Sequence, residues 1–376
     1  MNSTQLALRV APMLVVSWSR VFALILPGLI ETYGLTLEQA GRCVSALEAG
    51  GFLAMLLLSF AIDRWGALRL LPGCLLVGIG ALFLSTLAPS YEILLLFFFF
   101  LGAGTAATAS AVNALMADTG PKRGFYLGIV HSAFGLFSIA APLAAGALIV
   151  YSGWQAYYLL VGLLGLIVTL LFFFSTRTDR QSWHPPAVAS SSGAALATLW
   201  RIAPLCMGVS TLVGIQGVFN SWSYLYSVDR FALSHATATL APSCIWLGIL
   251  LGRAGHTGLS RRFAPRPLLL ASCLLTGAAA LGAYLAPVFG LAFAAFVGIG
   301  MGVGGAYQLG TAWATDRAPE HIGAASTFIM AAAALGSAIW PWLAGLVVGS
   351  NGFTALPWVV LIAVGVGLAA FALSRT

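Results

Sequence analysis

Charge is scarce in this sequence. Asp, Glu, Lys and Arg make up only 7% of its 376 residues, whereas they make up about a quarter of an ordinary soluble domain. This deficit excludes a soluble protein of such length, and a hydrophobic content of 60% with a mean hydropathy of +0.98 places the chain in a lipid bilayer. The first apolar segment lacks a small-residue cleavage site and is too long for a signal-peptide core, so we expect it to remain as a membrane span.

The patterns typical of enzymes and metal centres are also missing. The five cysteines occur singly, without the paired spacing of metal ligands, and the chain has no H-E-x-x-H motif and no histidine cluster. We therefore expect no disulfide, no metal, no cofactor and no enzymatic activity. The net charge of +7 is scattered in short clusters between apolar runs, which indicates membrane topology rather than nucleic-acid binding.

Apolar runs of about 20 residues predict twelve membrane-spanning helices. Six precede and six follow "STRTDRQSWHPPAVASSSGAAL", residues 175–196, which is polar and rich in Pro and Ser, as flexible linkers are. We expect an all-α integral membrane protein with an N-terminal six-helix bundle over residues 1–175, a cytoplasmic linker over 176–199 and a C-terminal six-helix bundle over 200–376.

Positively charged residues are concentrated in alternate loops. With the N-terminus inside, the cytoplasmic segments hold most of the Lys and Arg residues, and the outer loops hold only Arg42 and Arg230. Because positive charge favours the inner side of a membrane, both termini are predicted to be cytoplasmic. We expect a monomer in a bacterial-type inner membrane.

Small residues recur in the fourth span of each half. The segments "LGAGTAATASAVNAL" (101–115) and "VGIGMGVGGAYQLG" (297–310) carry them at three- and four-residue spacing, which lets helix backbones approach closely in lipid. Tight packing alone explains this pattern, although smooth contacts would also suit two bundles that rock against each other. The matching positions of the two segments indicate internal duplication.

The loop after the second predicted span reads "SFAIDRWGALRLL". Its Asp63, Arg64, Gly66 and Arg69 resemble the G-x-x-x-D-R-x-G-x-x-R signature of the major facilitator superfamily, with Ser59 where that family usually has Gly. "TGLSRRFAPRPLL", at the corresponding place in the second half, resembles a degenerate second copy. The resemblance implies two pseudo-symmetric six-helix bundles and secondary transport by alternating access.

The four signature residues are interpreted as a conformational latch. A carboxylate at the C-terminal end of a helix is disfavoured by the helix dipole unless cations meet it. Positive-inside anchoring explains Arg64 and Arg69 but not Asp63. We therefore expect Asp63 to pair with a cation in one conformation of the transporter and to be released in the other.

Ionisable residues that lie within predicted spans need a partner or a function. Arg20, near the middle of the first span, cannot shed its charge, so it must face a polar cavity, a carboxylate or an anion. Glu48 on the second span is the better partner for Arg20, because Glu31 lies about 16 Å from Arg20 along the first helix. A direct pair between Arg20 and Glu48 would be strained. The sequence leaves two alternatives open: a structural salt bridge, or Arg20 for an anionic substrate with Glu48, Glu31 or His131 carrying a proton.

Other candidates follow from the spans that line the cavity in the resembled family. The expected substrate-binding residues besides Arg20 are Trp18, Asn113, Gln216, Asn220, Tyr307, Gln308 and Thr311. A charged first half and a neutral, aromatic second half favour proton-coupled uptake of a small organic anion. The alternative is proton-driven efflux of drugs or amphipathic metabolites, although "FSIAAPLAAG" (137–146) keeps only Pro142 and Gly146 of the family's antiporter motif.

Overall fold

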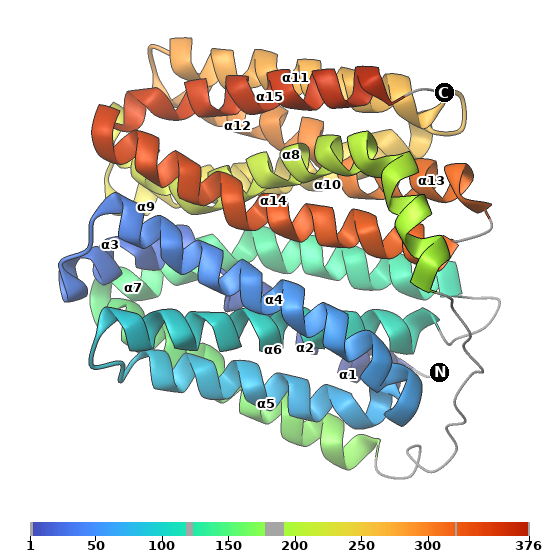
Figure 1. Cartoon of the computed structure of the whole chain (residues 1–376). Helices are drawn as coiled ribbons and strands as arrows, with labels where there is room; N and C mark the ends of the chain where they lie inside the picture. Colours follow the sequence, from blue (N-terminus) through green and yellow to red (C-terminus); the bar gives the residue numbers. More distant parts are fainter. Residues whose placement is uncertain (1–2, 118–122, 177–191, 320–321, 375–376) are drawn as a thin grey trace. The chain divides into compact units, whose positions relative to one another are not determined.

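The computed structural model describes residues 3–117, 123–176, 192–319 and 322–374, and in these ranges the chain is helical without strands (Figure 1). Its first half contains α1 (Ser3–Val10), α2 (Pro12–Trp18), α3 (Phe22–Tyr33), α4 (Leu37–Trp65), α5 (Ala67–Ser85), α6 (Tyr91–Ala117) and α7 (Arg123–Ser175). Its second half contains α8 (Ser192–Phe231), α9 (His235–Ala238), α10 (Leu240–Leu259), α11 (Pro265–Leu285), α12 (Phe289–Val303), α13 (Ala306–Arg317), α14 (Ile322–Asn351), the 3-10 turn η4 (Phe353–Ala355) and α15 (Leu356–Leu373).

The number of spans follows from helix length and apolar content. Ten helices of the described residues are long and apolar enough to cross a membrane, and the pair Ser3–Trp18 and Phe22–Tyr33, bent by 43°, adds an eleventh. The apolar part of α7, Phe125–Ser175, would be about 77 Å long, more than twice the hydrocarbon thickness. It is interrupted by Gly153 at φ 77° and ψ 167°, so α7 supplies two spans and the predicted total of twelve is confirmed.

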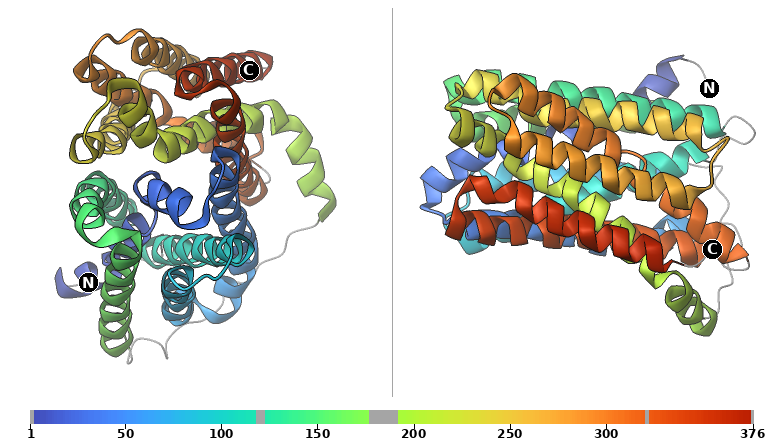
Figure 2. Two further views of the ribbon diagram at one scale, coloured as in Figure 1. Left: turned by 90° about the vertical axis from the view of Figure 1, so that its left-hand side faces the viewer. Right: turned by 90° about the horizontal axis from the view of Figure 1, so that it is seen from above.

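The chain divides into two compact units. Met1–Gly34 with Arg42–Val188 forms the first unit, and Leu35–Gly41 with Ala189–Thr376 forms the second. Most of the linker predicted over 176–199 lies outside the described residues, but residues 192–199 form the first two turns of α8. Within the first unit α5 packs along α6, and within the second α11 packs along α12 and α15 (Figures 1 and 2).

Glycines at corresponding positions make the same contacts in both units. A Cβ on Gly102 of α6 would overlap the carbonyl oxygen of Leu47 on α4, and one on Gly300 of α12 would overlap that of Ile245 on α10. Both partners of the second contact lie 198 positions after their counterparts in the first. The internal duplication is therefore visible as a constant register, residue i of the first unit matching residue i + 198 of the second.

Further contacts of the glycine-rich segments keep the same register. Gly50 meets the carbonyl of Phe99 as Gly248 meets that of Val297, and Gly104 meets Gly78 as Gly302 meets Thr276. These contacts join helices inside one unit. The close approach predicted from the small residues is thus confirmed as tight packing within each unit.

Candidate functional site

The first span is broken at Ser19, Arg20 and Val21. Helix α2 ends at Trp18, α3 begins at Phe22, and Val21 between them has φ −78° and ψ 47°, outside the helical region. Pro27 lies close to this break but within the continuous α3. A proline removes one hydrogen bond, here to the carbonyl of Ala23, and α3 accommodates that loss. The actual break places Arg20 outside both helices.

A tyrosine from a distant part of the first unit satisfies one carbonyl freed at this break. The Tyr157 hydroxyl, on α7, donates a hydrogen bond of 2.7 Å to the backbone oxygen of Trp18. Next to it, the Ser19 hydroxyl donates to the carbonyl of Val16 at 3.0 Å. Because lipid offers no hydrogen bonds to exposed backbone groups, such partners are what make a broken span tolerable.

Arg20 and Glu48 form a direct ion pair within the first unit. The Arg20 Nη2 donates to Glu48 Oε1 on α4, and the two side chains are 28% and 18% exposed. The sequence left direct pairing open because a continuous helix would point the two side chains apart. The break removes that obstacle, since Arg20 no longer follows the direction of either helix.

The second unit has no counterpart of this ion pair. Val218 and Trp246 occupy the positions that match Arg20 and Glu48 in the repeat, and α8 runs unbroken through 217–219. The fold therefore needs neither the charges nor the break at this place. A broken helix with an ionised side chain at the break is typical of a ligand-binding position in membrane transporters.

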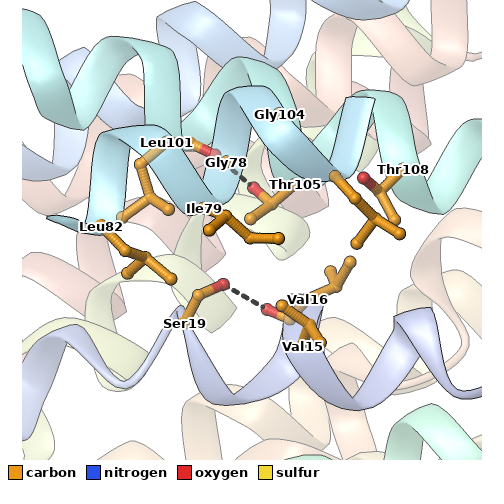
Figure 3. Close-up of a pocket in the computed structure, with 11 residues that line it drawn as sticks. Val15, Val16, Ser19, Gly78, Ile79, Leu82, Leu101, Gly104, Thr105 and Thr108 are labelled. Atoms are coloured by element: carbon orange, nitrogen blue, oxygen red, sulfur yellow. Dashed lines mark hydrogen bonds between the residues drawn. The ribbon is translucent and has the colours of Figure 1, made fainter. Parts of the chain in front are cut away.

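A small hollow lies beside the break (Figure 3). Val15, Val16 and Ser19 lie across it from Ile79 and Leu82 of α5 and from Thr105 and Thr108 of α6. The hollow measures about 10 Å³, which is room for about one water molecule. The buried hydroxyl of Thr108, one of the lining residues, has no hydrogen-bond partner among the described residues.

Replacing Tyr157 with phenylalanine is expected to destabilise the protein by about 1 kcal/mol, because it leaves the buried Trp18 carbonyl without its donor. The matched control is Tyr158→Phe. The Tyr158 hydroxyl is fully buried and has no partner among the residues that the structure describes, so its removal is expected to be neutral or slightly stabilising. Thermal unfolding in detergent measures both effects, and equal midpoints for the two variants would contradict the role given to Tyr157.

The other sequence-predicted residues of the first unit do not join the ion pair. Glu31 is exposed in the last turn of α3, and His131 is exposed on α7. The Trp18 indole nitrogen and the Asn113 Oδ1 are buried and lack a hydrogen-bond partner among the described residues. The role of these two residues in substrate binding stays a prediction.

The candidates of the second unit lie on two helices. Gln216 and Asn220 are half-buried on α8, four residues apart, and the Asn220 Oδ1 is buried without a partner. On α13, Tyr307 and Gln308 are exposed, and the Thr311 hydroxyl donates to the Tyr307 carbonyl at 2.8 Å. The role of these residues in substrate binding stays a prediction.

The proposed latch is only partly described. The side chain of Asp63 lies outside the described residues, whereas Arg64 and Arg69 are exposed and the Arg64 guanidinium lies 5.5 Å from the Trp65 ring centroid. Gly66 has φ 81° at the turn from α4 to α5, a conformation that favours glycine. This explains the glycine of the motif, and the latch itself stays a prediction.

Comparison with known sequences gives relatives that are named as transporters or as a multidrug resistance protein. The chain is 24% identical to the multidrug resistance protein MdtL of Klebsiella pneumoniae over 86% of this chain and 83% of that protein. It is 27% identical to the probable sulfoacetate transporter SauU of Cupriavidus necator over 53% of this chain and 49% of that protein. It is 21% identical to the glucose/mannose transporter GlcP of Bacillus subtilis over 85% and 81% of the two chains.

Solved structures share the fold. The nucleoside transporter NupG superposes with a TM-score of 0.79 at 17% identity, covering 99% of this chain and 98% of that one. A bacterial homologue of the human lysosomal transporter Spinster, in an inward-facing and occupied conformation, gives 0.75 at 18% identity over 99% and 96%. The family model of the Major Facilitator Superfamily matches residues 13–341. With its two six-span units, this chain belongs to the Major Facilitator Superfamily.

Proposed function

We propose that this chain is a proton-coupled secondary transporter that takes up a small organic anion by alternating access. The observation that carries the proposal is the Arg20–Glu48 ion pair at the break of the first span. An arginine at such a place binds carboxylate or sulfonate groups well because its planar guanidinium presents several fixed donors.

The ion pair gives a direct route to coupling. While Glu48 is ionised, its carboxylate is paired with the Arg20 guanidinium, so an anionic substrate must compete with this carboxylate for Arg20. A proton on Glu48 removes that competitor and leaves Arg20 free for the anion. Proton and anion then bind together, and for a singly charged anion the net charge at the site is the same before and after loading.

Several further points support or complete the proposal. Sulfoacetate, in the name of the relative SauU, is a small organic anion. The unpartnered Trp18 nitrogen and Asn113 Oδ1 provide polar atoms for the uncharged part of a substrate.

We place the protein as a monomer in an inner membrane with both termini cytoplasmic, as the distribution of Lys and Arg indicates.

Glu48→Gln is expected to uncouple uptake from the proton gradient, because glutamine can still hydrogen-bond Arg20 but cannot bind and release a proton. In proteoliposomes, an inward proton gradient should accelerate sulfoacetate uptake by the wild type and leave the variant unaffected. Exchange of labelled for unlabelled sulfoacetate, which needs no gradient, should persist in the variant. Gradient-driven accumulation by Glu48→Gln would exclude Glu48 as the coupling residue. If sulfoacetate is not transported, the same assay with other short carboxylates and sulfonates decides the substrate class.

Proton-driven efflux of drugs or amphipathic metabolites is the alternative, and the similarity to MdtL over most of both chains favours it. In that case Glu48 would bind a cationic substrate and a proton alternately. Formation of the ion pair with Arg20 would release whichever cation is bound. Expression in an efflux-deficient host separates the two functions. Increased tolerance to several cationic drugs would support efflux, whereas growth on an organic acid as carbon source would support uptake.

A further inference from the structure

A histidine of the second unit lies against the break between α12 and α13, a short interruption at Gly304 and Gly305 where both residues keep right-handed helical dihedral angles. Its Nδ1 lies 2.6 Å from the Gly252 carbonyl oxygen, and its Nε2 lies 2.9 Å from the Ser272 hydroxyl on α11. This residue is His256, on α10. A Cβ on Gly305, the residue before α13, would overlap the imidazole ring. Glycine at 305 therefore makes room for His256 beside the break.

The first unit shows what the fold requires at the same three positions. The residues that match His256, Ser272 and Gly305 in the repeat are Leu58, Cys74 and Ala107, and these form one buried apolar cluster. Helix α6 also continues unbroken through Ala107, whereas its counterpart is divided into α12 and α13. The polar cluster and the nearby break therefore occur together in the second unit. The first unit packs without either feature at the matching positions.

We propose that His256, Ser272 and Gly305 form a proton-binding site that controls the break between α12 and α13. A carbonyl oxygen only accepts hydrogen bonds, so Nδ1 carries a proton and, in the neutral ring, Nε2 accepts from the Ser272 hydroxyl. A proton taken up from water adds to the Nε2 lone pair and turns that nitrogen into a donor. Ser272 must then rotate its hydroxyl to accept, and the ring becomes a cation against the broken backbone.

The charged side chains near the ring are mostly cationic. Arg253 lies one turn earlier on α10, and its Nε is buried without a hydrogen-bond partner. Among the described residues, Asp316 is the one carboxylate carried by α10 to α13. The other titratable or charged side chains near this end of the unit, among the described residues, are Arg201 and Cys206 on α8, Arg261 and Arg262 directly after α10, Arg266 and Cys273 on α11, and Tyr307 and Arg317 on α13, with none on α12.

This charge balance links the proton to a conformational change. A cation in this partly buried cluster is costly, whereas the same cation in contact with water is not. The proton consequently binds more tightly when the break opens, and acidification shifts the population towards the opened form. Histidine is suited to this because its unperturbed pKa, about 6.5, lies near neutral pH.

Hydrogen–deuterium exchange of the purified protein in nanodiscs, without substrate, tests the proposal. After normalisation to the intrinsic exchange rate, backbone exchange over residues 300–311 should rise about 5-fold or more when the pH falls from about 8 to about 5.5. In the triple variant His256→Leu, Ser272→Cys and Gly305→Ala, which carries the side chains of the first unit, exchange of this segment should not depend on pH.

A second variant keeps the test decisive if the triple variant fails to fold. His256→Asn retains a donor near the position of Nδ1 but cannot bind a proton in this range, so it should also abolish the pH dependence. A wild type without pH-dependent exchange, or an asparagine variant that keeps it, would overturn the proposal. The measurement requires no transport, so its outcome is independent of whether Glu48 couples uptake to protons.

Discussion

Arg20→Ala is expected to lower the initial rate of anion uptake by about 100-fold, the effect of losing about 2.7 kcal/mol of charged hydrogen bonding to the substrate. The variant removes the guanidinium that meets the anion and leaves the partly buried Glu48 carboxylate without its partner. Uptake of labelled sulfoacetate into proteoliposomes measures the rate. Arg20→Lys should retain part of the activity with a higher KM, because lysine keeps the charge but presents no planar fork of donors.

The double variant Arg20→Ala and Glu48→Gln separates a binding role from a structural one. If the ion pair only holds α4 against the first span, removing both charges should restore thermal stability and uptake together. If Arg20 binds the anion, the double variant should recover the thermal midpoint that Arg20→Ala loses while uptake stays absent. Recovery of uptake in the double variant would leave the proposed anion site without support.

The sequence predicted the spans well because each is marked by its own apolar run, and it predicted Arg20 and Glu48 as the residues to examine because charge is costly in lipid. The break at 19–21 could not be foreseen in the same way. Neither Gly nor Pro occurs at these three positions, and the group that satisfies the Trp18 carbonyl, Tyr157, lies far along the chain. The strained pairing expected for Arg20 followed from assuming an unbroken helix.

His256 was missed for a different reason. A single histidine near the end of a span carries little information by itself, and the sequence reveals its unusual place only when compared with Leu58 of the other half. That comparison needs the exact register between the two halves of the chain. In the sequence, only the loop motif indicates such a register. The contacts of Gly102 with Leu47 and of Gly300 with Ile245 establish it.

Gly102→Ala is expected to impair both folding and uptake, whereas the matched Gly300→Ala should impair folding alone. Each added methyl would overlap a backbone carbonyl, of Leu47 on α4 or of Ile245 on α10, and no rotamer change can relieve a clash between backbones. Helices held together in lipid by close packing must then separate, at a cost of about 1–3 kcal/mol. The thermal midpoints of both variants should fall by similar amounts, while Gly80→Ala, where a Cβ meets nothing within 4 Å, should be unaffected.

The two variants differ in what lies next to the displaced carbonyl. Leu47 immediately precedes Glu48, so moving α4 away from α6 shifts the carboxylate relative to Arg20. Ile245 precedes Trp246, the apolar counterpart of Glu48 in the repeat. Measured on the folded fraction, the KM for sulfoacetate should therefore rise in Gly102→Ala and stay unchanged in Gly300→Ala. An equal rise of KM in both variants would show that substrate binding depends on general packing rather than on the ion pair. Of the two contacted residues, only Leu47 is followed by a charged residue.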